Sequence, residues 1–355
     1  MAAKLLQPRP TKKTVSIARL AAHLGLSEGT VSRALNNYPD ISRTTRERVA
    51  RVARELGYRP SSTARRLARG VVETVGFVLP GRAGHVSAPF LAEFLDGIAS
   101  ELALYDWDVI VAAVPEGHEG RDVVERLIRS GKVGGFVLTR TRRSDSRVAY
   151  LKQEGVPFVL YGRTDACDDC VFLDVDNEKA FVDAVNHLHG LGHRRIAHLA
   201  GDLSYTYAHL RRRGYRAAMA ALGLDIPDGY IVDGVVDAAS SDSATTGLLA
   251  LPNPPTAILG VTDEVALGAM RAIARAGLKV GRDISVMGYD GLPIGLAAEP
   301  PLTTMSQSSA DAGRHVAHMI KALIEDGTLE EPRVLWEAKL TPRASTSRPP
   351  AEEPT

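Results

Sequence analysis

The chain has 355 residues, of which 45% are hydrophobic, and its formal net charge is only +1. This length exceeds what one ordinary core supports and predicts two or three domains. No run of 18 apolar residues and no signal-like apolar segment near Met1 occurs, so the sequence predicts neither a membrane span nor export. Two cysteines in a chain of this size are typical of a protein from the reducing cytoplasm.

Charge is unevenly distributed along the chain. Residues 1–70 contain 15 Lys and Arg against 4 Asp and Glu, a net charge of +11, so residues 71–355 carry a net charge of −10. A concentrated basic segment is typical of nucleic-acid binding. Arg-rich helices can also be merely solvated faces, so the charge needs a supporting motif.

A helix-turn-helix pattern supplies that motif. Ala21 is small enough for two helices to cross closely, and Gly25 can adopt the left-handed conformation that ends the first helix. Val31 and Leu35 are spaced i, i+4 on the buried face of the second helix, and Ser27 is a candidate N-cap for it. The opposite face presents the residues that would meet base edges: Glu28, Gly29, Ser32, Arg33 and Asn36. The pattern therefore predicts binding to duplex DNA.

Two further segments complete the basic region. Residues 43–57 have the apolar spacing of a third amphipathic helix, with Gly57 as its stop signal. Residues 61–69 are Arg-rich and helix-compatible, but Leu67 is their only large apolar residue. We expect this segment to be ordered only when it packs against something else.

From Glu73 onward, short apolar strands alternate with amphipathic helices. Strands are predicted at 75–79, 109–114, 135–138, 158–161, 195–199, 231–236, 257–261 and 284–289. Helices are predicted at 90–104, 121–129, 147–154, 178–191, 210–222 and 264–276, and residues 172–176 are assigned to a loop. This alternation predicts two doubly wound subdomains with parallel sheets, and a small-molecule site in the cleft between them.

The sequence contains no strong catalytic or metal-binding motif. It has no nucleophile elbow, no phosphate-binding glycine loop and no His-Glu-x-x-His pair. His187, His189 and His193 are interpreted as surface or capping residues. Cys167 and Cys170 lie in an acidic loop without the further ligands that zinc needs, and are interpreted as an incidental pair. We therefore predict no enzyme activity, no catalytic residues, no metal and no cofactor.

Several motifs resemble the LacI/GalR family of bacterial transcription regulators, over a match from about Thr14 to Ser345. They include Leu26-Ser27-Glu28-Gly29-Thr30-Val31-Ser32-Arg33, Leu56-Gly57-Tyr58-Arg59-Pro60, Leu191-Gly192-His193-Arg194-Arg195, Arg211-x-x-Gly214-Tyr215, Thr262-Asp263-Glu264-Val265-Ala266-Leu267-Gly268-Ala269 and Gly288-Tyr289-Asp290. The resemblance implies a homodimer whose paired heads read a palindromic operator. It also implies a body similar to periplasmic sugar-binding proteins, with an effector in the cleft.

The resemblance also assigns residues to the two sites. DNA contacts fall on Ser16, Ser27, Glu28, Gly29, Thr30, Ser32, Arg33, Asn36, Ser42, Thr45, Tyr58, Ala64 and Leu67. Among these, Arg33 matches a base-reading arginine, and Leu67 matches a leucine that enters the minor groove. Effector contacts fall on Phe90, Tyr161, Arg211, Thr262, Asp263 and Asp290.

Some positions depart from the family pattern. Glu28 and Gly29 occupy the variable operator-reading positions, so the operator sequence does not carry over. Thr262 stands where many members have Asn, and Gly162 where many have Asp. Gly162 either leaves space for a larger glycoside or is simply a glycine at the end of a strand.

We therefore expect an all-α helix-turn-helix domain joined to a periplasmic-binding-protein-like α/β body of two doubly wound parallel-sheet subdomains. The expected divisions are a flexible extension at 1–13, the DNA-binding domain at 14–60, a hinge at 61–72, the body at 73–345 and a disordered tail at 346–355. The expected function is a cytoplasmic repressor controlled by a small carbohydrate inducer. The first alternative is a corepressor-type regulator with a purine-like ligand. A transport binding protein ranks below it as a second alternative.

Overall fold

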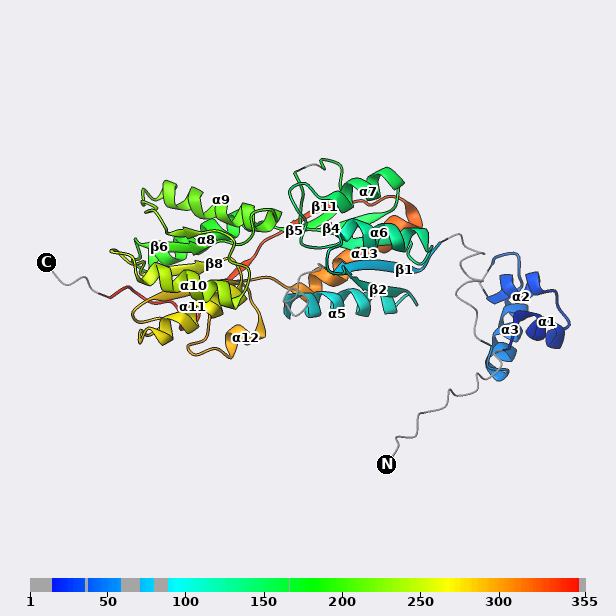
Figure 1. Ribbon diagram of the computed structural model, residues 1–355. Helices are drawn as coiled ribbons and strands as arrows, with labels where there is room; N and C mark the ends of the chain where they lie inside the picture. The colour runs from blue at the N-terminus through cyan, green and yellow to red at the C-terminus, as the bar shows by residue number, and fades with distance from the viewer. Residues whose placement is uncertain (1–14, 36–37, 59–70, 80–88, 166, 351–355) are drawn as a thin grey trace, which may run out of the picture. The chain divides into compact units, whose positions relative to one another are not determined.

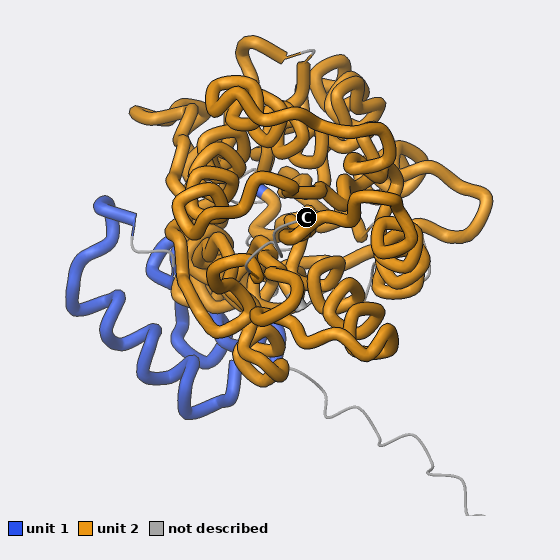
Figure 2. Tube along the Cα trace, turned by 90° about the vertical axis from the view of Figure 1, so that its left-hand side faces the viewer, with its two compact units in different colours: residues 1–71 blue, residues 72–355 orange. Residues whose placement is uncertain are grey.

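The computed structural model describes residues 15–35, 38–58, 71–79, 89–165 and 167–350. The chain forms two compact units, residues 1–71 and 72–355, which are drawn in different colours in Figure 2. The predicted extension at 1–13 lies outside the described residues. So do Asn36 and most of the predicted hinge, including Ala64 and Leu67.

The described residues of unit 1 form three helices, as predicted. Its helices are α1 (Ile17–Leu24), α2 (Glu28–Leu35) and α3 (Arg43–Glu55). Gly25 adopts a left-handed conformation with φ of 66° at the end of α1, which confirms the predicted turn. Ala21 and Val31 are buried in the core that the three helices share, together with Leu20 and Val49. The small core holds together helices that are too short to be stable alone.

The first sheet of unit 2 is entirely parallel, with the strand order β11-β5-β4-β3-β1-β2. Its strands are β1 (Thr74–Leu79), β2 (Asp108–Ala113), β3 (Gly135–Leu138), β4 (Phe158–Tyr161), β5 (Phe172–Val175) and β11 (Arg333–Trp336). The helices of this subdomain are α5 (Pro89–Ala103), α6 (Gly120–Arg129), α7 (Ser146–Glu154) and α13 (Ser309–Asp326). They cover the sheet on both sides, as Figure 1 shows.

The second sheet has the order β12-β10-β9-β8-β6-β7, and only β12 runs antiparallel to its neighbour. Its strands are β6 (Ile196–Leu199), β7 (Ile231–Val232), β8 (Ala257–Gly260), β9 (Ser285–Asp290), β10 (Thr303–Ser306) and β12 (Lys339–Thr341). Its helices are α8 (Asn177–Gly190), α9 (Thr206–Ala221), α10 (Ala238–Leu249), α11 (Asp263–Arg275) and the short α12 (Pro293–Leu296). Separate apolar cores lie under the α8–α9 and α10–α11 pairs, so the predicted α/β body is confirmed.

The two subdomains are not consecutive halves of the chain. After β10 in the second sheet, the chain returns to the first subdomain to form α13 and β11, and then crosses back to form β12. The sequence analysis identified neither these late elements nor α10. It also assigned residues 172–176 to a loop, whereas residues 172–175 form β5. Asp174 interrupts the apolar run of residues 172–175. This segment is nevertheless a strand, because it pairs with β4 and β11.

Close helix contacts explain one of the sequence motifs. Gly214 lies on α9, and a Cβ atom at this position would stand 2.2 Å from the carbonyl oxygen of Glu178 on α8. Gly313 on α13 similarly lets α5 approach, because its Cβ would stand 2.2 Å from the Phe94 carbonyl oxygen. Only glycine permits these crossings, which set the positions of α9 and α13 beside the cleft.

The C-terminal segment corrects the prediction of a disordered tail from residue 346. Ser347 donates its backbone N–H to Ser285 Oγ at 3.1 Å, and its carbonyl oxygen lies 2.9 Å from His193 Nε2. Thr346 is hydrogen-bonded to Thr303. Residues 346–350 are therefore part of the body, and His193 is a buried structural residue rather than a surface one.

Two other features bear on the sequence analysis. Cys167 and Cys170 are joined by a disulfide, whereas we expected an incidental pair. Within the described part of the chain, none of the helices is long and apolar enough to cross a membrane.

Candidate functional site

Hydroxyl residues cap the N-termini of the three helices in the described part of unit 1. Ser27 Oγ accepts a hydrogen bond from the Thr30 backbone N–H at 3.1 Å and lies 2.8 Å from Thr30 Oγ1, at the start of α2. Ser42 and Thr45 repeat this arrangement at the start of α3, with distances of 3.2 and 2.8 Å. Ser16 caps α1 in the same way. Helix N-termini with exposed hydroxyls are suited to phosphate contacts, because their unpaired N–H groups and dipoles favour anions.

The outer face of α2 carries the predicted base-reading residues. Glu28, Gly29 and Arg33 are exposed, and Ser32 is partly buried. Arg33 Nη1 lies 2.8 Å from Asp40 Oδ2, and about half of each side chain is exposed. Such a surface ion pair is worth at most about 1 kcal/mol, so a guanine edge or a phosphate can displace Asp40. Tyr58 is partly buried against the core of unit 1.

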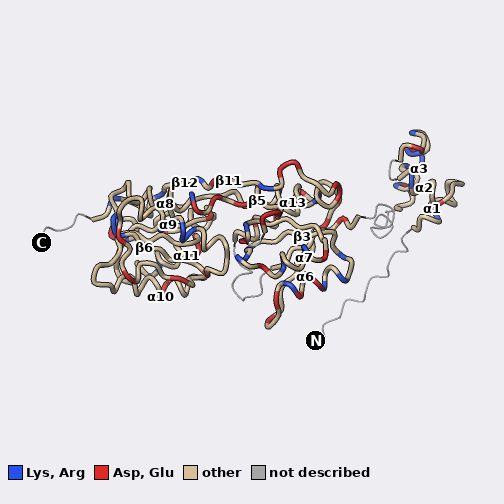
Figure 3. Tube along the Cα trace, turned by 90° about the horizontal axis from the view of Figure 1, so that it is seen from above, with Lys and Arg blue, Asp and Glu red and all other residues tan. Residues whose placement is uncertain are grey.

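The described part of unit 1 is rich in basic residues, as the sequence predicts. Helix α3 alone carries five arginines against two glutamates. Figure 3 shows Lys and Arg positions on unit 1 beside a few acidic ones.

A cleft in unit 2 brings together five of the six predicted effector residues. Phe90, Tyr161, Arg211, Thr262 and Asp290 all line it. Phe90 comes from α5, Tyr161 ends β4, and Asp290 ends β9. The cleft therefore lies at the carboxyl ends of parallel strands from both sheets, where ligands bind in open α/β folds.

Arg211 is the most constrained side chain of the cleft. Its Nε donates to Asn177 Oδ1 at 2.7 Å, and its Nη1 donates to the Val261 carbonyl oxygen at 2.6 Å. The guanidinium carbon lies 3.5 Å from the ring centre of Tyr289 and 4.9 Å from that of Tyr207. The two rings and two acceptors fix the guanidinium, which offers its remaining N–H groups to a ligand.

A hydrogen-bonded chain connects the two subdomains at the other side of the cleft. The Tyr161 hydroxyl donates to Gln307 Oε1 at 2.7 Å, and Gln307 Nε2 donates to Asp290 Oδ1 at 3.0 Å. Gln307 lies between β10 and α13, on a segment that crosses from one subdomain to the other. The amide of Gln307 therefore joins a phenol of the first subdomain to a carboxyl of the second.

A second network crosses the cleft floor. Arg163 Nε donates to Asp174 Oδ2 at 2.7 Å, and Asn177 Nδ2 donates to Asp174 Oδ1 at 3.3 Å. Asn177 in turn holds Arg211, so the network continues from β4 to α9. Burial raises the pKa of the Asp174 carboxyl, and Arg163 opposes this effect.

Asp263 does not line the cleft, although the resemblance placed it among the effector contacts. Its Oδ2 accepts from the backbone N–H groups of Gly291 and Leu292 at 2.9 and 2.8 Å, and its Oδ1 accepts from Thr304 Oγ1 at 2.7 Å. This fully buried carboxylate fixes the turn that follows Asp290. Thr262 does line the cleft, and its hydroxyl also caps α11 by accepting from the Val265 N–H.

The sequence analysis did not select several other residues that line the cleft. They are Arg140, Thr141, Arg163, Asp174, Val175, Asn177, Tyr207, Glu264, Leu292 and Gln307. Many of them follow or end the strands β3, β4 and β5, so the rule that ligands bind at strand carboxyl ends could have found them. No sequence signal marks Gln307, because its place depends on the return of the chain to the first subdomain.

The cleft lining contains as many carboxyl groups as arginines. Three arginines, Arg140, Arg163 and Arg211, face three carboxyls, Asp174, Glu264 and Asp290. Phe90 stacks on Tyr161 with ring centres 5.7 Å apart, which adds an aromatic wall. This combination suits an uncharged ligand with many hydroxyl groups and an apolar face. Among the described residues, no three His, Cys, Asp or Glu side chains are grouped to hold a metal ion.

Burial has a large effect on Asp290. Burial raises the pKa of its carboxyl to about 7, and the Arg211 guanidinium only partly offsets the effect. Its backbone has a φ of 131°, which is rare for a residue other than glycine. The strand end is therefore held in a costly conformation that presents this carboxyl to the cleft.

Comparisons with known proteins match both units of the chain. Residues 15–61 match the family described as bacterial regulatory proteins, lacI family, and residues 185–346 match a periplasmic binding protein-like domain. The HTH-type transcriptional regulator AglR of Rhizobium meliloti is 39% identical over 346 residues, which cover 96% of each chain. The HTH-type transcriptional regulator RafR of Escherichia coli is 32% identical, over 94% of this chain and 99% of the relative.

Solved structures confirm the fold. A complex of the transcriptional regulator CelR with cellobiose has a TM-score of 0.72 and 29% identity, covering 93% of this chain and 99% of that one. The lac repressor dimer bound to operator and the anti-inducer ONPF has a TM-score of 0.81 and 28% identity, with coverages of 94% and 100%.

The raised pKa of Asp290 predicts a pH effect on stability. The folded protein keeps a proton on this carboxyl that the unfolded chain releases near pH 4, so its contribution to stability is complete below pH 4 and is lost as pH rises through about 7. The Asp290→Asn variant has no carboxyl at this position, so it does not lose stability in this way as the pH rises. We expect the melting temperature of the wild type to fall relative to that of Asp290→Asn between about pH 4.5 and pH 8.

Asp283→Asn is the matched control, because Arg282 lowers the pKa of the partly buried Asp283 carboxyl and its titration lies below this range. A difference between wild type and Asp290→Asn that does not change with pH would show that Asp290 titrates normally.

Proposed function

This chain belongs to the LacI family of bacterial regulatory proteins, and we propose that it is a cytoplasmic transcriptional repressor whose operator affinity is controlled by a neutral saccharide. Unit 1 would bind the operator, and the cleft of unit 2 would bind the saccharide. The cleft lining, in which carboxyl groups match the arginines in number and Phe90 and Tyr161 form an aromatic wall, is the observation that carries the ligand class.

The operator interface rests on α2 and the capped helix starts. The N-termini of α2 and α3, capped by Ser27 and Ser42, would bind phosphates, and Arg33 would read a guanine. Ala64 and Leu67, outside the described residues, are proposed as hinge contacts, with Leu67 entering the minor groove at the operator centre. Glu28 and Gly29 leave few side-chain donors beside Arg33, so Arg33 should carry much of the discrimination.

The ligand class follows from the charges of the cleft. Arg163 is already paired with Asp174, and two donor groups of Arg211 are already engaged by Asn177 and the Val261 carbonyl. An anionic ligand such as a sugar phosphate would compete with these partners and would lie beside the carboxyl groups of Asp174, Glu264 and Asp290. A neutral saccharide would instead accept from Arg211 and donate to Asp290, with one face against Phe90 and Tyr161. The structural relative CelR was solved with cellobiose, a neutral disaccharide.

The same contacts suggest how the saccharide would act. The Tyr161–Gln307–Asp290 chain and the Arg163–Asp174–Asn177 network both span the two subdomains. Ligand hydroxyls would replace some of these bonds, so the ligand would favour one angle between the subdomains over another. A ligand changes the equilibrium only by its unequal affinity for the two states. The hinge would transmit the chosen state to unit 1.

The proposed repressor acts as a homodimer. Leu267, Met270 and Ala274 on α11 line an apolar groove with Ile294 on α12. Ile294 is 54% exposed, and Leu296 on the same short helix is 61% exposed. Large exposed apolar side chains beside a groove are typical of an interface. A second copy of this chain is the proposed occupant, as the lac repressor relative was solved as a dimer on its operator.

Operator recognition is tested with Arg33→Ala. A palindrome is first selected from a randomised duplex library with the wild-type protein. We expect the substitution to weaken binding to this palindrome by about 1–3 kcal/mol and to relax discrimination at one base pair of each half-site. Arg51→Ala, which removes an exposed arginine paired with Glu55 on α3, is the control and should keep the discrimination. Equal losses on the palindrome and on random DNA would show that Arg33 contacts only phosphate.

Effector binding is tested by calorimetry on the full chain, with neutral mono-, di- and trisaccharides, including cellobiose, against sugar phosphates. We expect binding in the neutral set, and a loss of about 2 kcal/mol, roughly 30-fold, in Asp290→Ala. Asp283→Ala should bind as the wild type does.

Preferential binding of sugar phosphates, or unchanged affinity in Asp290→Ala, would contradict the proposed ligand site. The sign of the effect on operator affinity separates induction, in which the saccharide weakens binding, from corepression.

The dimer is tested by sedimentation of the full chain. Leu296→Glu places a charge in the proposed interface and should raise the dissociation constant at least about tenfold, since one buried carboxylate costs several kcal/mol. Leu104→Glu changes a side chain that is 75% exposed and does not line the groove, and it should leave the dimer intact. A monomeric wild type, or a Leu296→Glu variant that dimerises as the wild type does, would contradict this interface.

A further inference from the structure

The disulfide between Cys167 and Cys170 lies in the loop that joins β4 to β5. The two sulfurs differ in their surroundings. Cys170 is 4% exposed and packs into the core under α6 and α7, whereas Cys167 is only partly buried. Cys167 is therefore the sulfur that a reagent from solvent can reach.

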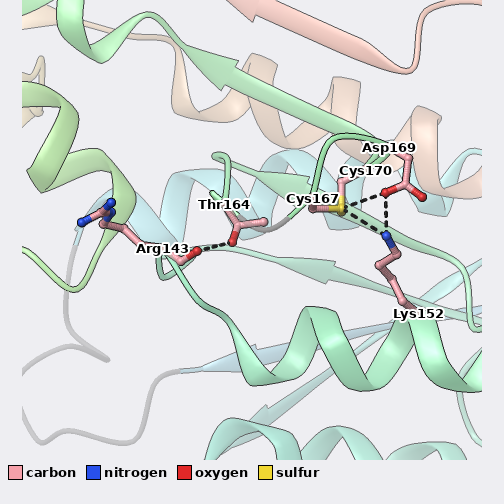
Figure 4. Close-up of a disulfide and its surroundings, with 6 residues drawn as sticks. All are labelled: Arg143, Lys152, Thr164, Cys167, Asp169 and Cys170. Atoms are coloured by element: carbon pink, nitrogen blue, oxygen red, sulfur yellow. Dashed lines mark hydrogen bonds and ion pairs between the residues drawn. A yellow bond between two sulfur atoms is a disulfide. The ribbon is translucent and has the colours of Figure 1, made fainter.

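A charged pair lies beside that accessible sulfur. Lys152 Nζ on α7 stands 4.0 Å from Cys167 Sγ, and Asp169 Oδ1 stands 3.5 Å from it. Lys152 and Asp169 are themselves paired at 2.6 Å, as Figure 4 shows. In the sequence, the two cysteines have only acidic residues as charged neighbours. The fold adds an ammonium group, which offsets the unfavourable effect of the Asp169 carboxylate on a thiolate at Cys167.

The loop that holds the disulfide also carries part of the cleft lining. Gly162 and Arg163 line the cleft five and four residues before Cys167, and Asp174 lines it four residues after Cys170. Between them, Thr164 Oγ1 donates to the Arg143 carbonyl at 2.8 Å, and Arg143 pairs with Asp165. The conformational freedom of the loop that joins β4 to β5 therefore affects the position of Arg163 relative to Asp174.

We propose that Cys167 and Cys170 form a reversible thiol–disulfide exchange site for small dithiols, and that its redox state sets the mobility of the loop between β4 and β5. The regulatory role rests on the proposed cytoplasmic function, because disulfides in that compartment are usually transient or redox-sensing. The ring closes over only two intervening residues, so it restrains the unfolded chain less than a long loop does. A role in regulation therefore fits this bond better than a role in global stability.

The exchange is a two-electron reaction. One thiolate of the dithiol attacks the Cys167 sulfur, the S–S bond breaks, and the electron pair leaves on the Cys170 sulfur, which takes a proton. The second thiolate of the dithiol then attacks its own sulfur partner in the mixed disulfide. A cyclic disulfide forms and Cys167 departs as a thiolate beside Lys152. The protein is reduced by two electrons, the dithiol is oxidised by two, and oxidised dithiol reverses both steps.

The exchange is tested on the full chain with mixtures of reduced and oxidised dithiothreitol, without DNA or saccharide. Alkylation of free thiols, followed by mass spectrometry, measures the disulfide fraction. We expect this fraction to fall as the share of reduced dithiothreitol rises and to recover when the mixture is reversed. Free thiols in every mixture, or a disulfide that survives excess dithiothreitol in the folded protein, would overturn the proposal. Neither result depends on whether the chain represses transcription.

Two further measurements test the mechanism. Lys152→Gln should slow alkylation of Cys167 in the reduced protein by about twofold to fivefold, the effect of losing one surface charge, while Lys179→Gln on α8 should not. Hydrogen exchange should become faster at 160–174 upon reduction and stay unchanged in β8. The Cys167→Ser variant should match the reduced protein in any mixture. Unchanged exchange at 160–174 would overturn the link between the disulfide and the cleft.

Discussion

The burial of Arg211 is the constraint on which the cleft depends. A guanidinium that is 5% exposed costs several kcal/mol unless partners replace the water it has lost. The partners come from separate elements: the Asn177 amide from α8, the Val261 carbonyl after β8, and the Tyr289 ring from β9. These elements must all be in place before Arg211 is satisfied, so the second subdomain is specified as a unit around one charge.

The constraint reaches the first subdomain through Asn177. The amide that holds Arg211 also donates to Asp174, which accepts from Arg163. Polar groups in a buried network are costly when left unpaired, but a ligand hydroxyl can take the place of a protein partner. The cleft can therefore satisfy its polar groups in more than one way. In the proposed mechanism, this interchange lets a bound saccharide favour one angle between the subdomains over another.

Unit 1 works under the opposite conditions. The groups that we propose to contact DNA are exposed: the hydroxyl caps at Ser27 and Ser42, and Arg33, which is paired with Asp40 at the surface. Exposed charges are screened by salt and cost little to rearrange, whereas the buried charges of the cleft are screened far less. The chain thus combines exposed groups in unit 1, whose interactions salt screens, with buried groups in the cleft, whose interactions depend less on salt.

Local features of this protein were determined by the sequence alone. The end of α1 at Gly25 and the cap of α2 at Ser27 depend only on residues within one helical turn. The apolar runs at 135–138 and 158–161 form β3 and β4, because fully buried strands need continuous apolar side chains. Family motifs added Arg211 and Asp290.

Other features were decided by the tertiary structure. The return of α13 and β11 to the first subdomain places Gln307 between Tyr161 and Asp290. Asp263 points away from the cleft, and Lys152 lies close to Cys167. Each of these joins residues far apart in the chain, and no local pattern encodes which distant partner will satisfy a buried polar group.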